Sequence, residues 1–377
     1  MDMKRILFIV VALAFTSCQT KGLKDSDQYG QAFDNDGITV FDLQGTWYQM
    51  GRQYGILAKS KMDDVLEYLD EKLGSDPDNV AAAAQIAHKL YSNYPEHLKD
   101  FFEGVCHTSG LSMEKVKLCN AVEYVEGVFL CSAMAVWDDY ADGKLVLGRN
   151  YDAASYAEID QDLVVTVFHP NDGIPTAIVG YAGELYCVNG LNANGIFVEL
   201  NNGMPSAGSE IHWDLCPSTT SLLDMLFGAQ NLDDVDDFFH TTQSSLSVTI
   251  GVADKNEART YEWCYDGVRR GDEMTDNGLM ISTNHYVHSS WPYCLPDDGS
   301  SWNSVTRRCN LLALAQQYKG CIDVEKMKEI MSTSIDDGGP LHDLTRYQIV
   351  AVPQDRTLFI LVPTVGEWVE INLGRFF

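Results

Sequence analysis

The sequence changes character at Cys131, and this change constrains the fold more than any other feature. Before it, residues 47–73, 78–105 and 111–128 carry apolar residues at intervals of three and four, the spacing of one helix face. After it come short apolar runs separated by turn sequences such as "HPNDG" and "NANG", a pattern typical of strands. The chain is therefore predicted to have a helical N-terminal part and a strand-rich remainder.

The strand-rich part is interrupted by helical patterns at 219–239 and 305–332, each of which reads as two consecutive helices. Strands in antiparallel runs with helices inserted in pairs favour two packed sheets with helices outside them, in the α+β class. The predicted strands are 144–148, 162–168, 176–181, 195–200, 247–253, 259–264, 279–283, 347–353 and 357–363.

The first residues read as an export signal. "MDMKRILFIVVALAFTSC" has a basic start, an apolar run and small residues before Cys18, and the run is too short for a permanent membrane span. Small residues before a cysteine resemble a bacterial lipobox, so we expect a signal peptide at 1–17 and lipidation of Cys18. Residues 18–40 would form a flexible tether, and the protein would be anchored to the bilayer in the periplasm or cell envelope.

The net charge of −28 makes nucleic acid an unexpected partner, because a polyanion would be repelled. The acidic residues are spread along the chain and indicate a solvated surface. The cysteines show no CxxC pair and no Cys/His ligand spacing, so neither a metal nor a cofactor is expected. Nine cysteines follow Cys18, an odd number, and we expect Cys131 to be a free thiol.

The position of Cys131 suggests a specific chemistry. If the Leu130–Cys131 bond were cut, one residue would carry both a thiol and a free α-amine. An α-amine has a pKa of about 7.7–8.0, which suits a base working near neutral pH. It could accept the thiol proton directly, so that no histidine is needed.

"CSAMAVWDDYADGKLVLGRNYD" resembles the opening of the catalytic chain in cysteine-type N-terminal nucleophile hydrolases. "LQGTWYQMGRQYG" is similar to the glycine-rich start of the pro-region in their acyl-CoA:6-aminopenicillanic acid acyltransferase branch. "GLNANGIFVELNN", "STNHY" and "NSVTRR" follow in that family's order, so the resemblance runs from Phe41 to the C-terminus. It implies a four-layer αββα sandwich of two antiparallel sheets, with a helical pro-region at 41–130 and a catalytic domain at 131–377.

The resemblance also implies site residues. Cys131 matches the nucleophile that also cuts its own precursor. Arg149 and Asp152, in "GRNYD", match the charged pair near the thiol. In physical terms Asp152 can hold the α-ammonium, while Arg149 stabilises the thiolate and balances the aspartate. Without the resemblance, the two would be read as a structural ion pair and Cys131 as a buried core residue.

Three further residues follow from the same match. Asn201 corresponds to the side-chain amide of the oxyanion hole, with Asn202 as the alternative if the register slips by one. Asn284 corresponds to a second active-site asparagine, and Arg307 to a downstream arginine, with Arg308 as the register alternative. Taken alone, both asparagines would be read as turn or strand-end residues.

The glycines at 45, 51 and 55 are expected to serve a turn and helix packing. A phosphate-binding loop is not indicated there, because no strand leads into them and no Lys-Ser/Thr pair follows.

The expected function is hydrolysis of linear, non-peptide amides such as N-acyl amino acids, N-acyl amines or penicillin-type side chains. Acyl transfer from acyl-CoA is less expected after export, and the long leader argues against the bile-salt hydrolase branch. Two alternatives stay open. One is an uncut enzyme that pairs Cys131 with His285 or His288, and the other is an inactive ligand-binding lipoprotein on the same fold.

Overall fold

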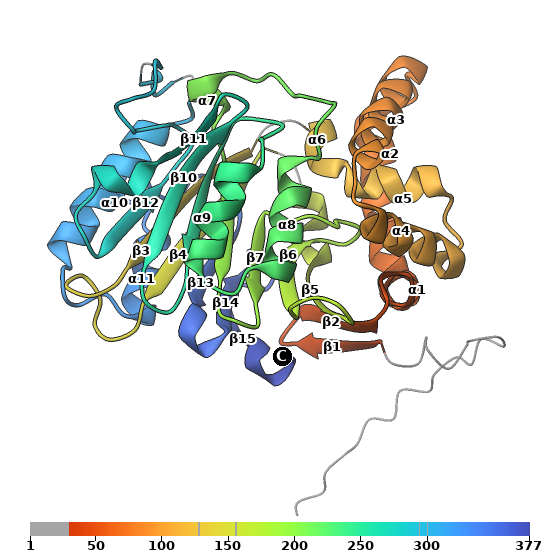
Figure 1. Ribbon diagram of the computed structural model, residues 1–377, viewed down its shortest axis with the longest axis horizontal. Helices are drawn as coiled ribbons and strands as arrows, with labels where there is room; N and C mark the ends of the chain where they lie inside the picture. Colours follow the sequence, from red (N-terminus) through yellow and green to blue (C-terminus); the bar gives the residue numbers. More distant parts are fainter. Residues whose placement is uncertain (1–29, 127–128, 155–156, 294, 300) are drawn as a thin grey trace, which may run out of the picture.

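The computed structural model describes residues 30–126, 129–154, 157–293, 295–299 and 301–377 (Figure 1). The predicted signal peptide, Cys18 and most of the predicted tether lie outside these residues, as does Cys294. The eight cysteines that the structure does describe are all free thiols, including Cys131.

The N-terminal part is mainly helical, as predicted. Its helices are α1 (Trp47–Leu57), α2 (Lys59–Leu73), α3 (Pro77–Ser92), α4 (Glu96–Ser109), α5 (Met113–Asn120) and α6 (Val122–Glu126). Ser112 caps α5 by accepting a hydrogen bond from the backbone N–H of Lys115, as its position before the periodic pattern predicts.

Two of the three glycines named from the sequence allow α1 to pack directly on α4. A Cβ atom on Gly51 would lie 2.0 Å from the carbonyl oxygen of Phe101, and one on Gly55 would lie 2.4 Å from Thr108 Oγ1. Gly45 has a φ of +119°, a left-handed conformation that ends the preceding strand and leads into α1. The predicted packing and turn functions of these glycines are confirmed.

The first sheet has nine strands and is mixed, which corrects the expectation of two antiparallel sheets. Its order is β1-β2-β5-β6-β7-β8-β9-β10-β11, and β2 runs parallel to β5. The strands are β1 (Gln31–Asn35), β2 (Ile38–Gly45), β5 (Leu163–Pro170), β6 (Thr176–Tyr181), β7 (Asn189–Asn192), β8 (Phe197–Asn202), β9 (Val248–Ala253), β10 (Ala258–Cys264) and β11 (Gly267–Arg270).

The strands β1 and β2 also correct two predicted boundaries. They extend into residues 31–45, where the sequence pattern predicts the end of a flexible tether and the start of a helical region. Because β2 pairs with β5 from Thr39 to Gly45, the N-terminal part shares a sheet with the C-terminal part. The helical part is therefore continuous with the strand-rich part through this sheet.

The second sheet has six strands in the order β12-β3-β4-β13-β14-β15 and is antiparallel throughout. Here β3 pairs with β4 so that Cys131 lies opposite Tyr151. The strands are β3 (Phe129–Val136), β4 (Val146–Ala153), β12 (Leu279–Ser282), β13 (Thr345–Val352), β14 (Thr357–Leu361) and β15 (Trp368–Asn372).

Helices cover the outer faces of both sheets, which gives an α/β/β/α arrangement (Figure 1). Helix α8 contacts β7 and α9 contacts β11, whereas α10 packs on β3 and β12 and α11 packs on β4 and β13. The helices of the strand-rich part are α7 (Met204–Ala207), α8 (Ser218–Gly228), α9 (Leu232–Thr241), α10 (Ser304–Gln317) and α11 (Val324–Met331). Short 3₁₀ helices occur at Ala157–Asp162, Gly271–Met274, Pro353–Asp355 and Leu373–Arg375.

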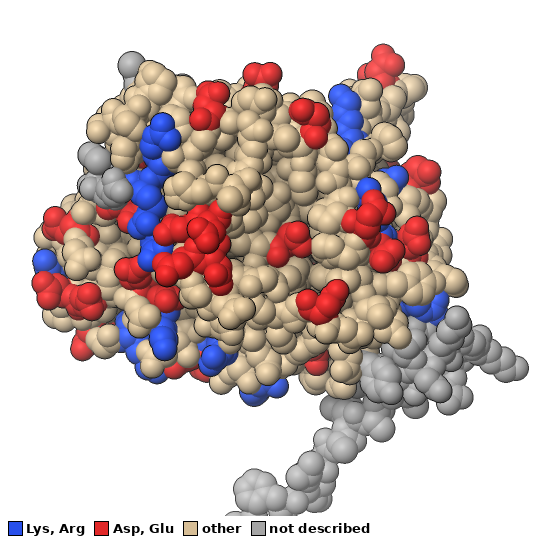
Figure 2. Space-filling model, in the orientation of Figure 1, with Lys and Arg blue, Asp and Glu red and all other residues tan. Residues whose placement is uncertain are grey.

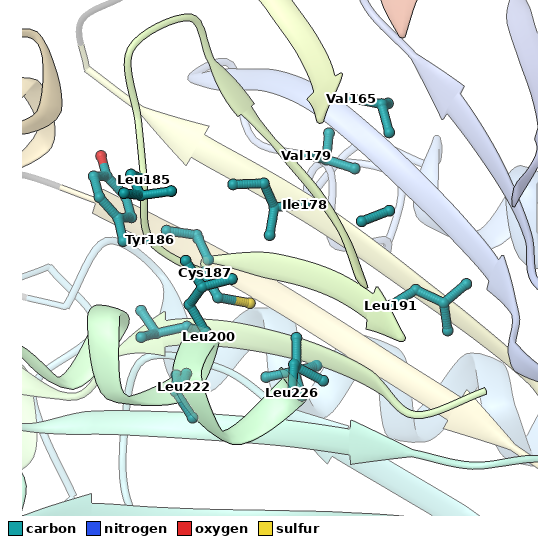
Figure 3. Close-up of a cluster of buried hydrophobic side chains, with 14 of the residues drawn as sticks. Val165, Ile178, Val179, Leu185, Tyr186, Cys187, Leu191, Leu200, Leu222 and Leu226 are labelled. Atoms are coloured by element: carbon teal, nitrogen blue, oxygen red, sulfur yellow. The ribbon is translucent and has the colours of Figure 1, made fainter. Parts of the chain in front are cut away.

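Two cores hold the layers together. One fills the space between the sheets and extends to α8, where Leu222 and Leu226 pack beside Cys187 and Leu191 (Figure 3). The other lies between the six-stranded sheet and helices α10 and α11. Successive side chains of β3 alternate between these cores because a strand has a period of two.

The surface charge is distributed, as the sequence pattern indicates. On the face shown in Figure 2, acidic side chains lie in scattered groups, and the largest group borders basic side chains. Among the described residues, ion pairs join Arg259 to Asp236 and Glu257, and Arg270 to Asp272. Among the helices of the described ranges, none combines the length and the apolar character that a membrane crossing requires.

Candidate active site

Cys131 points into the interior between the two sheets. It is the third residue of β3, and together with Ala135 it belongs to the core between the sheets, whereas Met134 and Val136 face the helices. Only 1% of its surface is exposed, but it lines a cavity of about 260 Å³. The thiol is thus buried and adjoins a space that a small ligand can occupy.

The side chain of Arg149 binds the sulfur. This residue lies on β4, two positions along the strand from the cross-strand partner of Cys131, and therefore on the same face. Its Nη2 atom donates to Cys131 Sγ at 3.2 Å and to the carbonyl oxygen of Leu200 at 2.6 Å. A fixed guanidinium at this distance favours the thiolate form.

Glu199 completes the support for this arginine. The Nη1 atom of Arg149 donates to a carboxylate oxygen of Glu199 and, at 2.8 Å, to Oδ1 of Asn201. Both partners in the Arg149–Glu199 ion pair have fully buried side chains. Burial raises the pKa of Glu199 to about 7, and Arg149 opposes this rise.

The thiol of Cys131 in the uncut chain is a weak acid. Burial raises its pKa to about 12, which the positive charge of Arg149 partly counteracts and the negative charge of Asp152 reinforces. A base close to the sulfur is therefore required before this thiol can act as a nucleophile at neutral pH.

The backbone of Cys131 is held by a second set of polar groups. Its N–H donates to Oδ1 of Asn284 at 2.9 Å, and its carbonyl oxygen accepts from Nη1 of Arg307 at 2.5 Å. Nη2 of Arg307 also donates to Asn284 Oδ1 at 2.8 Å, so the three residues form one network. Arg307 is fully buried and bonds to Cys131, whereas Arg308 makes no hydrogen bond to Cys131, so Arg307 is the better placed of the two register alternatives.

Asp152 lies beside this network with one carboxylate oxygen unused. Oδ1 accepts a hydrogen bond from Thr345 Oγ1 at 2.6 Å, while Oδ2 is 3.8 Å from Arg307 Nη1 and has no hydrogen-bond partner among the described residues. Burial raises the pKa of Asp152, and Arg307 opposes this rise. A buried carboxylate oxygen without a partner is costly unless another donor reaches it.

The two neighbouring asparagines on β8 differ in what they can offer a ligand. Asn201 donates through Nδ2 to Glu199 at 3.1 Å and to Ser282 Oγ at 2.5 Å, so both amide protons are already used. Asn202 instead lines the cavity with Cys131, and its Nδ2 makes no hydrogen bond to residues that the structure describes. Asn202, the register alternative, is therefore better placed to donate a hydrogen bond to a ligand in the cavity. Asn201 instead holds Glu199 and Arg149 in position.

Asn284 also ties the site to β8. Its Nδ2 donates to the carbonyl oxygen of Asn202 at 2.9 Å, and its backbone N–H donates to Ser304 Oγ at 2.8 Å. Asn284 therefore fixes the Cys131 backbone relative to the strand that carries Asn202.

The histidines that the sequence offers as alternative partners lie elsewhere. His285 Nδ1 is hydrogen-bonded to Ser304 Oγ at 2.8 Å and to Thr283 Oγ1 at 3.2 Å. Burial lowers the pKa of His285 to about 4, which leaves its ring neutral and a weak base. His288 Nδ1 contacts Ser290. In the described part of the chain no histidine is hydrogen-bonded to Cys131, so the Cys/His arrangement finds no geometric support.

Sequence reasoning missed Glu199, Glu123 and Tyr151. The position of Glu199 could have been noticed, because it precedes Asn201 by two residues on one strand and so shares its face. Glu123 and Tyr151 line the cavity together with Cys131. No sequence signal connects Glu123 on α6 with this cavity, since only the tertiary fold brings it there.

No family model matches the chain, and a search of curated proteins finds no match either. Solved structures do resemble it. An N-acylethanolamine-hydrolysing acid amidase ortholog from Caenorhabditis elegans is 19% identical, with a TM-score of 0.46 over 59% of this chain and 93% of that one. The conjugated bile acid hydrolase of Clostridium perfringens is 12% identical, with a TM-score of 0.45 over 65% of this chain and 93% of that one.

Penicillin V acylase from Agrobacterium tumefaciens is 8% identical, with a TM-score of 0.43 over 64% of this chain and 86% of that one. At identities of 19% or less and TM-scores of 0.46 or less, these likenesses leave the family of the chain open.

Proposed function

We propose that this protein hydrolyses linear, non-peptide amides through a thioester on Cys131, after the chain has been cut between Leu130 and Cys131. The observation that carries the proposal is the placement of one residue. Its sulfur adjoins a cavity and contacts Arg149, while its backbone nitrogen is held separately by Asn284. The two atoms that an N-terminal nucleophile needs are therefore each positioned by their own partners.

The proposed cut uses the same sulfur. The Cys131 sulfur attacks the carbonyl carbon of Leu130, and the thiol proton passes to the peptide nitrogen as the C–N bond breaks. This leaves a thioester between Leu130 and the sulfur, which water hydrolyses to a Leu130 carboxylate, a free thiol and a free α-amine. The unused Oδ2 of Asp152 supports this scheme, because the new ammonium supplies donors that the uncut backbone lacks.

In the proposed turnover, the α-amine takes the thiol proton and the thiolate attacks the substrate carbonyl. The side-chain amide of Asn202 is the proposed donor to the oxyanion. The α-ammonium then protonates the leaving amine, and water hydrolyses the thioester to regenerate the thiol. Arg149 lowers the energy of the thiolate, and Glu199 holds Arg149 in place. Transfer of the acyl group to a second amine instead of water is part of the same proposal.

The test of processing is the intact mass of the purified wild type and of a Cys131→Ala variant. We expect two fragments that meet at Leu130/Cys131 in the wild type and one uncut chain in the variant. A wild type that stays uncut but turns over N-acyl amides would contradict the proposed α-amine base. Turnover is measured on a panel of N-acyl amino acids, N-acyl amines, penicillin V and conjugated bile salts.

One observation favours a second candidate, an inactive ligand-binding protein on this fold. Burial raises the pKa of the thiol in the uncut chain to about 12, so little of it is thiolate near neutral pH. If processing does not occur, the cavity would still bind a ligand. Labelling of Cys131 with iodoacetamide near neutral pH separates the two functions, since only the activated thiol reacts rapidly.

Export and lipidation at Cys18 also remain our proposal, on the sequence alone. Replacing Cys18 with alanine should release the protein from the membrane fraction of its host without changing turnover. Wild-type protein that already fractionates as soluble would contradict the anchor.

A further inference from the structure

The cavity beside Cys131 combines apolar walls with a single carboxyl group. Val188, Leu200, Met204 and Leu246 provide apolar lining, and Glu123 is the only Asp or Glu among the described lining residues. None of those lining residues is Lys, Arg or His. Apart from the cysteine and tyrosine side chains, Glu123 is therefore the one lining side chain among the described residues that carries a formal charge when ionised.

Glu123 is held close to the nucleophile. It lies on α6, is 6% exposed, and accepts a hydrogen bond from the hydroxyl of Tyr151 at 2.5 Å. Tyr151 is the cross-strand partner of Cys131, and such partners have Cβ atoms about 4.5–5.5 Å apart. The carboxyl group of Glu123 is thus bonded to Tyr151, which lies directly opposite Cys131 on the neighbouring strand.

Other polar groups gather on the same side. The hydroxyl of Tyr124, the next residue on α6, is 3.0 Å from Thr219 Oγ1, and both residues line the cavity. The apolar residues Met204 and Ile211 belong to the segment that follows β8. We assign the apolar walls to the acyl group and the α6 side to the amine half of the substrate.

Among the residues that the structure describes, no cation forms an ion pair with Glu123. Arg149 is the cation that acts on it, and Arg149 is itself ion-paired with Glu199. Burial raises the pKa of Glu123 to about 7, so the carboxylate form predominates only above that pH. Several other titratable groups are close enough to Glu123 for their charges or hydrogen bonds to affect its pKa, or for Glu123 to affect theirs. They are Tyr124 on its own helix, Arg149 and Tyr151 on β4, Glu184 and Tyr186 in the segment between β6 and β7, and Tyr347 on β13.

We propose that Glu123 selects the substrate by the charge of its amine half, favouring N-acylated diamines and other cationic amines and rejecting amides of amino acids. This inference rests on the proposed amidase function and names its substrate class. A cation next to Glu123 gains a partner for a buried carboxylate, whereas a second carboxylate would meet a like charge where water cannot screen it.

The first test compares three amides that share one octanoyl group and differ in the amine: putrescine, butylamine and γ-aminobutyrate. The kcat/KM of the full-length wild type is measured at about pH 6 and about pH 8, on either side of the Glu123 pKa of about 7. We expect the cationic amide to exceed the anionic one by about tenfold or more at the higher pH. The ratio should shrink at the lower pH, where Glu123 is protonated. A ratio of the two kcat/KM values that does not change with pH, or that favours the anionic amide, overturns the inference.

The variant test uses Glu123→Gln, which removes the charge and keeps the size. It should bring the cationic and anionic amides to similar kcat/KM values. Glu210→Gln is the matched control, because Glu210 is an exposed acid next to the lining residues Ser209 and Ile211, and its replacement should leave the ratio unchanged. A Glu123→Gln enzyme that keeps the wild-type ratio contradicts the assignment. If this variant does not fold, the pH dependence of the wild-type ratio still decides.

A labelling test separates this inference from the proposed function. Aminoethyl and sulfonatoethyl methanethiosulfonate carry opposite charges, and their rates of reaction with Cys131 are followed on the peptide that contains it. We expect the cationic reagent to react faster with the wild type, by a factor that Glu123→Gln removes. Charge-selective labelling without turnover of any amide would refute the amidase and leave the selecting role of Glu123 standing. Turnover of amides without charge-selective labelling would support the amidase and refute the selecting role of Glu123.

Discussion

Arg149 connects the candidate nucleophile to a second buried charge: one nitrogen of its guanidinium donates to Cys131 Sγ at 3.2 Å, and the other pairs with Glu199. Sulfur, guanidinium and carboxylate thus form a line from β3 through β4 to β8, which joins the two sheets at the site. This arrangement makes the site part of the core, so that stability and activity can be perturbed by the same residues.

Replacing Arg149 with leucine should cost about 3–5 kcal/mol in the free energy of unfolding, because Glu199 would remain buried without its cation. The double variant Arg149→Leu with Glu199→Gln should recover much of this loss while remaining inactive. Urea unfolding of the three proteins measures both effects. Equal unfolding free energies of the single and double variants would show that the charge of Glu199 does not destabilise the fold when Arg149 is absent.

Asn202→Ala should lower kcat by about 10²–10³ with little change in the unfolding free energy, the loss expected for one oxyanion donor. Asn201→Ala should instead act mainly on stability, because its amide holds Glu199 and Ser282. Steady-state kinetics and urea unfolding of both variants distinguish the two residues. The reverse outcome would restore Asn201 as the donor.

After cleavage at Leu130/Cys131 the two fragments should remain associated. Strand β2 stays paired with β5, and α6 supplies Glu123 and Tyr124 to the cavity wall. Both fragments should therefore elute together in native size-exclusion chromatography and separate only in denaturant. A catalytic fragment that is active without the N-terminal fragment would argue against the assigned cavity wall.

Thermal stability should fall as pH rises from about 4.5 to about 7. Burial raises the pKa of both Glu123 and Glu199 to about 7 from an ordinary value of 4.5. Between these values the folded chain holds protons that the unfolded chain has released, so raising the pH favours unfolding. Melting temperatures across this window measure the slope, and Glu123→Gln should make it shallower. A stability that increases with pH in the wild type would contradict the raised pKa values.

His285→Gln should leave cleavage and turnover largely intact, because the ring bonds to Thr283 and Ser304 and not to Cys131. Loss of a general base lowers rates by about 10²–10⁴, which makes the alternative easy to recognise. Mass analysis and kinetics of this variant provide the measurement. An uncut, inactive His285→Gln protein that still folds would favour the Cys/His mechanism.

Much of the site could be predicted from local sequence. The apolar period predicted the helical N-terminal part and nine strands. Only the structure shows the pairing of β3 with β4 and the additional strands β1, β2, β7, β11 and β15. The grouping of Asn284 and Arg307 with Cys131 was predicted by motif order, and the structure places them in contact.

The choice between Asn201 and Asn202 could not be made from sequence, because a shift of one residue along a strand moves a side chain to the opposite face. The parallel pairing of β2 with β5 could not be predicted from the sequence either, because the long helical connection between the two strands does not indicate which residues pair. Glu123 lines the cavity beside Cys131 only because the tertiary fold brings its carboxylate to Tyr151 on β4.

The amino-acid sequence by itself determined the helices and most of the longer strands, because these depend on side-chain period, and the resemblance of its motifs named Cys131 as the candidate nucleophile. The tertiary structure alone decided which asparagine faces the cavity, which carboxylate binds Arg149 and which acid lines the pocket. Those contacts join segments far apart in sequence, and their geometry is fixed by packing between layers, which no local pattern encodes.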